Sequence, residues 1–508
     1  MKERLILFSL IVAAFFLRVF LIQKYSFVFA YDMGRDLLWS KDIAFYHIPT
    51  LIGPAASIWG IYFGPAWYYF LSIPLLLSRG NPVSAVYTTA LVQVLTPLVA
   101  YLLFRNILNK KFLIIFTILL LFNATSISIS TFAFHANMLP LLTLLVTYFC
   151  YQAIVKNPLY IALTFFTTSL MFHADPAPAV AFTFVPLFFF FRYRLYKTKP
   201  IGTITLSVIF YLLPFTPQII FELRNNFVEV RSLVSYFSGN NPSLSGQLPL
   251  VPRIINRIII FYNFFKFSFS PQSNPIALFL LGATFYGTIN FLKNAKDKTA
   301  KLVLAINIYS LIIIFCVYTI FVTVEVKVWY LYGLTTTLTF LLAFTLYSVH
   351  KYKILQIFII SAITFLCTYN FLSAKVSVSK KDPGLFSNQQ EAIDKIYEDA
   401  GRNTFSVYVF TPTIYDYSYQ YLFWWQAVKL NKGLPQEFSY LPRVPSYVRN
   451  KQVYETRPAS ESKITYLIME NSQENEFYKK SDWTQNFNDK KAIWTKNIND
   501  AITIKKLE

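Results

Sequence analysis

Acidic residues are scarce in the first 375 residues of this 508-residue chain, and glycine and cysteine are scarce throughout. The chain holds 14 glycines and three cysteines. The glycines form neither a P-loop nor a dinucleotide-binding pattern, which argues against a nucleotide-binding loop. The cysteines lie inside apolar runs, without the spacing of a disulfide framework or a zinc site. Only nine carboxylates occur in residues 1–375, so each one near the end of an apolar run needs a physical reason; they are Glu3, Asp32, Asp36, Asp42, Asp175, Glu222, Glu229, Asp297 and Glu325.

Apolar residues dominate the chain instead. Hydrophobic residues make up 55% of it and aromatic residues 19%, a composition typical of proteins that cross a membrane many times. The formal net charge is +21, but the Lys and Arg residues are scattered over short loops rather than gathered into one basic stripe. We therefore interpret them as topology signals and expect no nucleic-acid partner.

Eleven apolar segments have roughly the length that a helix needs to cross a bilayer. They lie at 5–23, 83–104, 112–128, 138–155, 158–174, 177–191, 201–220, 275–292, 302–322, 329–349 and 354–372. The positive-inside rule places the amino terminus and the basic loops in the cytoplasm. Segment 61–78 is broken by Gly64, Pro65 and Pro74, and segment 254–269 is amphipathic. We predict 11 crossings, or up to 13 if these two segments also cross, with the carboxyl terminus outside in either case.

The composition changes near residue 376. From there the chain carries 18 Lys and Arg and 16 Asp and Glu residues, with many Tyr, Asn and Ser. Apolar periodicity predicts helices over 388–400 and 417–429 and strands over 404–410, 464–469 and 501–507. We therefore predict an α-helical polytopic membrane domain at 1–375 and a small extracytoplasmic α/β domain at 376–508.

Polar residues cluster at the ends of the spans that are predicted to face outward. Seven of the nine carboxylates fall on that side. The polar residues of four outer loops, together with a fifth position at Lys327, could line a charged cavity that opens outward. Each residue also has a simpler interpretation, as a solvated loop charge, a local pair at a helix end or a snorkelling side chain. Arg18, late in the first span, is predicted to snorkel. The candidate site residues are Asp32, Arg35, Asp36, His135, Asn137, His173, Asp175, Glu222, Arg224 and Lys327.

The segment after the first span resembles a motif of known glycosyltransferases. The sequence is similar to the GT-C superfamily, specifically to family 39, the group of protein O-mannosyltransferases and bacterial aminoarabinose transferases. Their first outer loop commonly reads Asp-Glu-x-x-Arg-Tyr; here Asp32 and Arg35 match, Met33 replaces the Glu, and Asp36 follows. The run Gly-Pro-Ala-Trp-Tyr-Tyr at 64–69 is similar to the family's Pro-Pro-Leu-Tyr-Tyr segment. The resemblance extends over residues 1–375 in architecture and over the first hundred in motifs.

This resemblance implies inverting transfer of a sugar from a polyprenyl-phosphate donor to a hydroxyl of a glycan, lipid or protein acceptor, on the outer face of the plasma membrane. Asp32, with Asp36 second, would be the general base. Arg35, Arg224 and Lys327 would hold the phosphate. A second acidic residue of the family corresponds here to Asn137 or has no counterpart. The resemblance implies no obligatory cofactor, and although carboxylates can bind a divalent metal, nothing in the motif indicates one.

Three other functions are compatible with the sequence. A transporter or flippase for lipid-linked sugars would also be basic and polytopic, but such proteins usually carry charges near the bilayer midplane and two related halves, which this sequence lacks. A glycan polymerase or ligase would use closely related chemistry with a larger acceptor. A non-catalytic scaffold with an outer sensor domain is the third. An assay with lipid-linked sugars and a panel of acceptors would separate these functions.

Overall fold

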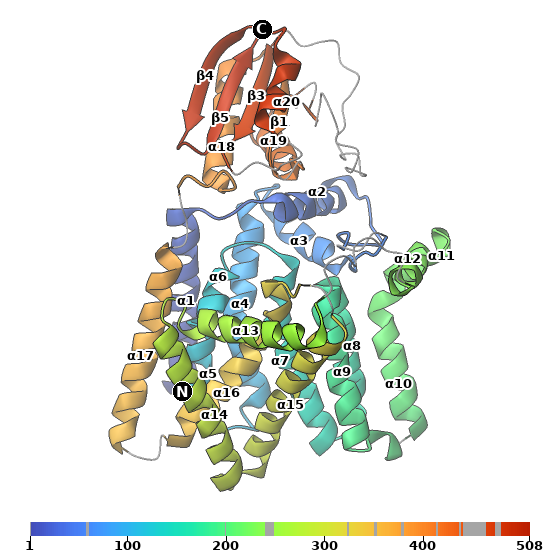
Figure 1. Cartoon of the computed structure of the whole chain (residues 1–508), viewed down its shortest axis with the longest axis vertical. Helices are drawn as coiled ribbons and strands as arrows, with labels where there is room; N and C mark the ends of the chain where they lie inside the picture. Colours follow the sequence, from blue (N-terminus) through green and yellow to red (C-terminus); the bar gives the residue numbers. More distant parts are fainter. Residues whose placement is uncertain are drawn as a thin grey trace. The chain divides into compact units, whose positions relative to one another are not determined.

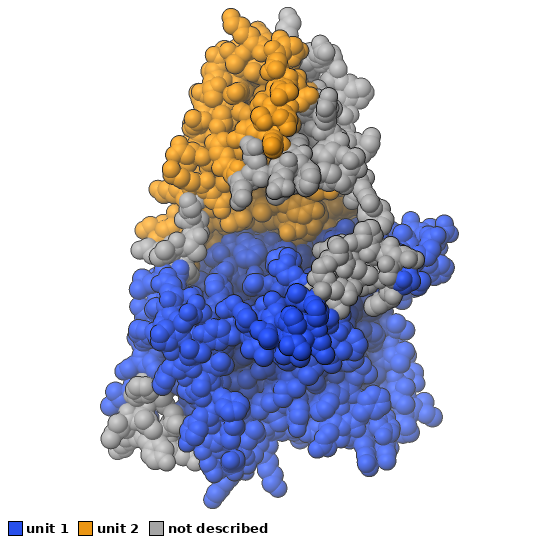
Figure 2. Space-filling view, viewed as in Figure 1, with its two compact units in different colours: residues 1–20, 49–67, 86–376 blue, residues 21–48, 68–85, 377–508 orange. Residues whose placement is uncertain are grey.

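A computed structural model describes the chain except for residues 1, 57–59, 199, 239–247, 323–324, 350–352, 377–379, 413–414, 436–437, 440–463 and 473–478. The described residues form two compact units (Figure 2). Unit 1 comprises residues 1–20, 49–67 and 86–376, and unit 2 comprises residues 21–48, 68–85 and 377–508.

Unit 1 is helical and apolar. Six of its described helices are long and apolar enough to cross a membrane, and several shorter apolar helices accompany them. In Figure 1, α14, α15 and α16 lie side by side. The helices wholly or mostly in this unit are α1 (Lys2–Tyr25), α4 (Val83–Phe104), α5 (Lys110–Leu121), α6 (Ala124–Ser128), α7 (Leu139–Val155), α8 (Tyr160–Leu170), α9 (Pro176–Arg192), α10 (Pro200–Leu212), α11 (Thr216–Arg224), α12 (Val228–Phe237), α13 (Leu250–Phe269), α14 (Asn274–Asn294), α15 (Lys298–Ile320), α16 (Leu334–Val349) and α17 (Lys353–Val376). Short 3-10 turns join several of them, namely η1 (His135–Met138), η2 (Met171–His173), η3 (Leu195–Lys197), η4 (Leu213–Phe215) and η6 (Val328–Leu331).

Helices occupy all eleven predicted spans, which confirms a polytopic helical membrane protein; the number of crossings stays a prediction. One span is broken where a polar residue interrupts it. Segment 112–128 splits into α5 and α6 at Asn123, whose side chain accepts the Ser126 N–H and so caps α6. Segment 201–220 lies in one helical run, Pro200–Arg224, in which the 3-10 turn η4 with Pro214 joins α10 to α11.

Arg18 does not snorkel, so that prediction is wrong. Its side chain is fully buried on α1. Its Nε donates to Ser130 Oγ at 2.9 Å, and its Nη2 donates to the carbonyl of Leu121, the last residue of α5, at 2.6 Å. A cation at this end of a helix satisfies a carbonyl that has no partner within the helix and opposes the negative end of the helix dipole. The sequence could not show this contact because Leu121 is 103 residues away.

Replacing Arg18 with methionine is expected to destabilise the membrane unit. Methionine fills much of the same volume but leaves the Leu121 carbonyl and the Ser130 hydroxyl without this donor. Each buried group left unsatisfied costs about 1 to 3 kcal/mol. We expect a lower midpoint of thermal unfolding in detergent than for the wild-type chain. The exposed Arg105 provides the matched control, since Arg105→Met removes no buried contact; equal midpoints for both variants would contradict this role of Arg18.

Unit 2 contains the predicted C-terminal α/β fold. Its five strands form one sheet in the order β2-β1-β3-β5-β4. Strand β1 pairs in parallel with β2 and β3, whereas β5 pairs antiparallel with β3 and β4. The elements of this fold are α18 (Phe386–Ala400), β1 (Phe405–Phe410), α19 (Tyr417–Leu430), β2 (Phe438–Ser439), β3 (Ile464–Glu470), α20 (Lys480–Thr484), η7 (Gln485–Phe487), β4 (Ala492–Ile498) and β5 (Ile502–Leu507). Helices α2 (Tyr31–Tyr46) and most of α3 (Ala66–Leu77) also belong to unit 2.

The two faces of this sheet are covered by different helices. Alternate residues of β1 and β3 point to opposite faces, as in any strand. On one face Phe405 contacts Tyr397 of α18, and on the other Phe410 contacts Trp483 of α20. Both predicted helices and all three predicted strands of this domain are present. Strand β4 was not predicted, because it is an edge strand with mostly exposed residues and little apolar periodicity.

Two buried carboxylates lie at the carboxyl end of the parallel strands. Asp416 precedes α19 and accepts a hydrogen bond from Gln420 Nε2 at 2.8 Å, and Glu470, at the end of β3, accepts one from Tyr419 at 3.0 Å. Burial raises the pKa of Asp416 to about 7. Burial, together with the charges of Asp382 and Asp416, also raises the pKa of Glu470 to about 7. The folded domain therefore favours the protonated forms of the Asp416 and Glu470 carboxyl groups.

The stability of the full chain should fall as pH rises through this range. A carboxyl whose pKa is higher in the folded state binds its proton more tightly there, so its contribution is complete below about pH 4 and is lost as pH passes about 7. We expect Asp416→Asn, which keeps an acceptor for Gln420, to flatten the decline in unfolding midpoint between pH 5 and 8, followed by tryptophan fluorescence. The exposed Asp489→Asn should leave the decline unchanged. A wild-type midpoint that rises over this interval would contradict the sign.

Candidate functional site

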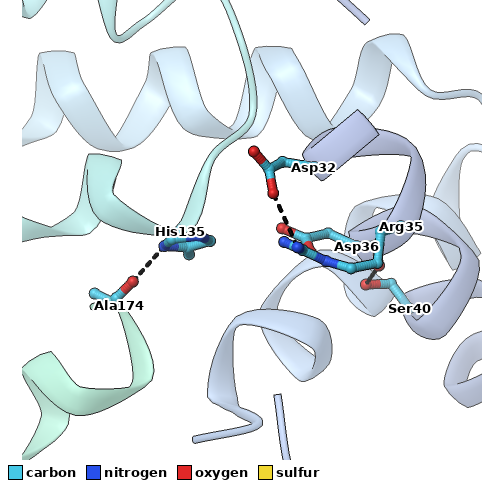
Figure 3. Close-up of polar contacts among 6 residues, drawn as sticks. All are labelled: Asp32, Arg35, Asp36, Ser40, His135 and Ala174. Atoms are coloured by element: carbon cyan, nitrogen blue, oxygen red, sulfur yellow. Dashed lines mark hydrogen bonds and ion pairs between the residues drawn. The ribbon is translucent and has the colours of Figure 1, made fainter. Parts of the chain in front are cut away.

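Asp32, Arg35 and Asp36 form a charged triad on helix α2. Spacings of three and four residues place them on one face of the helix. The Nη1 of Arg35 lies 2.9 Å from Asp32 Oδ1, and its Nη2 and Nε lie 2.8 and 2.9 Å from Asp36 Oδ1 (Figure 3). The backbone carbonyl of Asp36 also accepts a hydrogen bond from Ser40 Oγ at 2.6 Å. Arg35 thus joins both carboxylates.

The Arg35 guanidinium is held by charge and by aromatic rings. It lies 5.3 Å from the centre of the Tyr31 ring and donates to the Tyr68 hydroxyl. Burial alone would lower the pKa of Arg35, but the charges of Asp36 and Asp32 raise it well above its ordinary value. Arg35 is therefore a fixed cation at every physiological pH.

The two carboxylates of the triad differ in exposure. The side chain of Asp32 is 47% exposed, whereas that of Asp36 is fully buried. A group that takes a proton from a substrate must reach that substrate within a hydrogen bond. The Asp32 carboxylate is open to solvent, whereas the buried Asp36 carboxylate anchors Arg35. The sequence ranked the same two residues without this distinction.

Three loops of unit 1 bring other predicted residues together. His135 of η1 bonds through Nδ1 to the backbone carbonyl of Ala174, between His173 and Asp175 (Figure 3). Asp175 precedes α9, caps it by accepting the Ala177 N–H at 3.0 Å, and is hydrogen-bonded to the Trp329 side chain of η6. His135 and Asp175 thus connect the loops that carry them.

His173 is occupied on both ring nitrogens. Its Nδ1 accepts the Ala66 N–H at 3.1 Å, so its Nε2 carries the proton and donates to the Pro214 carbonyl at 3.0 Å. This is a neutral imidazole without a lone pair left for a substrate proton. Its role in the structure is to hold residues 64–66 against η4.

Asn137 and Glu222 also hold backbone. Asn137 is fully buried, and its Nδ2 donates to the carbonyls of Ile129 and Phe132 at 2.9 Å each. Glu222 of α11 accepts the Glu229 and Val230 N–H groups at 2.9 and 3.1 Å. These are the first-turn donors of α12, which have no partner within that helix. Glu222 therefore fixes the turn between α11 and α12.

Arg224 and Lys327 are the predicted cations that unit 1 exposes. Arg224 ends α11 with an exposed side chain, and among the described residues it forms no ion pair with Glu222. Lys327 pairs with Glu325, and its side chain is 42% exposed. Both charges are accessible to an anion. Within the described part of the chain, no group of three His, Cys, Asp or Glu side chains could hold a metal ion.

The sequence analysis did not predict that aromatic residues contact Arg35. Tyr31 and Tyr68 touch Arg35 directly, and Tyr31 lies 5.2 Å from Tyr415 and 5.3 Å from Tyr417 between ring centres. Tyr31 could have been found from its position one helical turn before Arg35, where a ring and a guanidinium meet. The partners Tyr415 and Tyr417 are nearly 400 residues away in sequence, and no local pattern points to them.

Comparisons with known proteins reveal a shared fold. No protein-family model matches the sequence, and no curated protein matches it either. Two crystal structures of ArnT from Cupriavidus metallidurans, one bound to undecaprenyl phosphate and one apo, match with a TM-score of 0.59 and 10% identity over 99% of this chain and 97% of that chain. The archaeal oligosaccharyltransferase AglB from Archaeoglobus fulgidus, in complex with an inhibitory peptide and a dolichol-phosphate, matches with a TM-score of 0.43 and 14% identity over 83% of this chain and 63% of that chain. This match is too weak to bear on the fold. The ArnT match extends over nearly the whole of both chains, and this chain therefore shares the fold of ArnT, one of the aminoarabinose transferases that the sequence resembles.

Proposed function

We propose that this protein is a membrane glycosyltransferase that moves a sugar from a polyprenyl-phosphate donor to an acceptor hydroxyl on the extracytoplasmic face of the plasma membrane, with inversion. The observation that carries the proposal is the triad on α2, which pairs an exposed carboxylate with a fixed, partly buried cation. The shared fold with ArnT, a protein solved with undecaprenyl phosphate bound, supports a lipid-phosphate donor.

The proposed reaction uses Asp32 as the general base. The Asp32 carboxylate takes the proton of the acceptor hydroxyl while the acceptor oxygen forms a bond to the anomeric carbon of the sugar. The bond between that carbon and the phosphate oxygen breaks on the opposite face, and the polyprenyl phosphate leaves with the electron pair. The anomeric centre is thereby inverted.

The leaving phosphate needs cations besides Arg35. The charges of Asp32, Arg35 and Asp36 sum to −1, so the triad alone does not favour an anion. A guanidinium carries five N–H groups. Arg35 directs three of them at the carboxylates and one at the Tyr68 hydroxyl, which leaves one for the phosphate. We assign the phosphate to Arg35, which can form charge-assisted hydrogen bonds, and the sequence resemblance implies the same role for the exposed cations Arg224 and Lys327 of unit 1. The buried groups of unit 1, among them His135, Asn137, His173, Asp175 and Glu222, would shape the surrounding loops.

The proposed orientation follows from the distribution of charge. The basic loops of the membrane domain mark the cytoplasmic side. Helix α2 and the C-terminal α/β fold belong to one compact unit, which supports placing both on the same, extracytoplasmic side.

Transfer by the purified full-length chain tests the proposal. The protein would be reconstituted in nanodiscs and incubated with radiolabelled sugars linked to undecaprenyl phosphate and to dolichyl phosphate, with glycan, lipid and peptide acceptors. We expect a glycosylated acceptor with inverted anomeric configuration and release of the polyprenyl phosphate. Movement of the intact donor across proteoliposomes without any transfer would overturn the proposal in favour of a flippase.

A further inference from the structure

Helix α2 meets the C-terminal α/β fold through a contact that only glycine permits. Gly34 lies between Asp32 and Asp36 and faces the start of α19. A β-carbon at Gly34 would lie 2.6 Å from Ser418 Cα and 2.6 Å from the Tyr417 carbonyl carbon. These are backbone atoms, so they cannot move aside as a flexible side chain could. The backbones of α2 and α19 are therefore in direct contact beside the triad.

Aromatic rings extend this contact to Arg35. The rings of Tyr415 and Tyr417 stack with centres 5.5 Å apart and planes 17° apart, and both contact Tyr31. The Tyr31 ring in turn contacts the Arg35 guanidinium. Tyr415 and Tyr417 follow the carboxyl end of β1, which is fixed on both sides by β2 and β3. Three stacked or tilted rings thus connect the start of α19 to the cation of the triad.

The chain that enters α2 is also fastened to the C-terminal fold. Phe29 N–H donates to the Gly384 carbonyl at 2.6 Å, and Phe386 N–H donates to the Phe27 carbonyl at 2.9 Å. The rings of Phe27 and Phe386 stack with centres 4.9 Å apart. These reciprocal bonds form a short antiparallel pairing just before α18. The amino end of α2 is thereby fixed.

The far end of α2 is held as well. Trp424 of α19 donates from Nε1 to the Tyr46 hydroxyl at 2.9 Å. The ammonium group of the fully buried Lys41 lies 5.3 Å from the centre of the Trp424 ring. Helix α2 is thus attached to the C-terminal fold at its start, beside the triad and at its end.

From these contacts we propose that the C-terminal α/β fold positions the Asp32–Arg35–Asp36 triad for transfer, with Gly34, Tyr415 and Tyr417 as positioning residues. This inference rests on the proposed function, since it assigns the C-terminal fold a part in that reaction. None of the three residues needs to touch the substrate. They act by fixing α2, and through it the direction in which Asp32 and Arg35 point.

Two measurements on the full-length chain test this role. In a cysteine-free background, spin labels at His47→Cys, just after α2, and at the exposed Val428→Cys of α19 report the separation of the two helices by pulsed electron resonance. Transfer of sugar from undecaprenyl-phosphate donors reports turnover. We expect Gly34→Ala to lengthen or broaden the label distance and to lower kcat at least tenfold. Tyr417→Ala should do the same to a smaller extent, and Tyr417→Phe, which keeps the ring, should restore both values.

Matched controls separate positioning from general damage. Gly433→Ala adds a methyl group in the same fold, where no heavy atom of the described residues other than its chain neighbours lies within 4 Å of it, and should change neither value. Tyr466→Ala removes a buried tyrosine that contacts Phe405 and Trp494 rather than α2; it should lower the unfolding midpoint but leave the label distance unchanged. A longer distance in Gly34→Ala with wild-type kcat would overturn the inference, as would an unchanged distance. If the wild-type chain transfers no sugar, the proposed function fails, while the label distances still decide whether the C-terminal fold holds α2.

Discussion

Asp32→Asn is expected to lower sugar transfer by about 10²- to 10⁴-fold, the range typical of a lost general base. The amide keeps the size of the carboxylate and still accepts a hydrogen bond from Arg35, but it cannot take the proton of the acceptor. Binding of undecaprenyl phosphate should therefore change little. Single-turnover transfer from a radiolabelled undecaprenyl-phosphate sugar, with the acceptor that the wild-type chain uses, would measure the effect.

The triad and a distant aspartate provide the controls for this prediction. Asp36→Asn should be milder, because Asp36 is fully buried and serves to hold Arg35. Asp297→Asn should leave transfer unchanged, since Asp297 caps α15 through Thr299 and Ala300 and asparagine caps helices as well. If Asp32→Asn retains wild-type turnover while Asp36→Asn abolishes it, the two roles are reversed. Wild-type turnover in both variants would place the base elsewhere.

Arg35→Lys is expected to weaken donor binding about tenfold to a hundredfold, equivalent to about 1.5 to 3 kcal/mol for a charge-assisted contact. Lysine keeps the charge but offers a single nitrogen, whereas Arg35 contacts Asp32 through Nη1 and Asp36 through Nε and Nη2. The variant loses the planar fork that spans both carboxylates and presents its remaining N–H to a phosphate. Titration of undecaprenyl phosphate into the nanodisc-embedded protein would give the affinity.

Lys327→Arg, the reverse substitution at an exposed cation, is the matched comparison for Arg35→Lys. Lys327 is partly exposed and pairs with Glu325, so Lys327→Arg keeps both its charge and its pairing. We expect this variant to bind undecaprenyl phosphate within about twofold of the wild-type chain, a difference of about 0.4 kcal/mol. Equal affinity in Arg35→Lys, Lys327→Arg and the wild-type chain would mean that the phosphate binds away from Arg35.

The sequence predicted the local elements of the fold but not its long-range contacts. The length of an apolar run located α4 to the residue, and the local sequence pattern located α18 and α19 within two residues, because these helices are defined by their own side chains. The burial of Arg18 depends on the Leu121 carbonyl, and the protonation of His173 depends on Ala66 and Pro214. Such contacts join distant segments. Periodicity within a single segment contains no information about them.

The candidate site shows the same division. The motif pointed to Asp32, Arg35 and Asp36 because their types and spacing are local. It could not show that Asp32 is exposed and Asp36 buried, since that difference arises from the packing of α2 in unit 2. The sequence predicts a substrate-binding role for Asn137, Asp175 and Glu222, and that role stays a prediction. Each is a polar residue at a helix end, and its backbone partners become visible only in three dimensions.

The contact between Gly34 and Ser418 also has a consequence for biosynthesis. Helix α2 is made within the first fifty residues, but its partner α19 begins 371 residues after α2 ends, at Tyr417. At typical elongation rates of about 5 to 20 residues per second, α19 leaves the ribosome roughly 20 to 75 s later. During this interval the triad has no α19 to pack against. A ribosome that stalls before α19 would therefore leave a chain with its apolar helices made and its charged helix α2 without this partner.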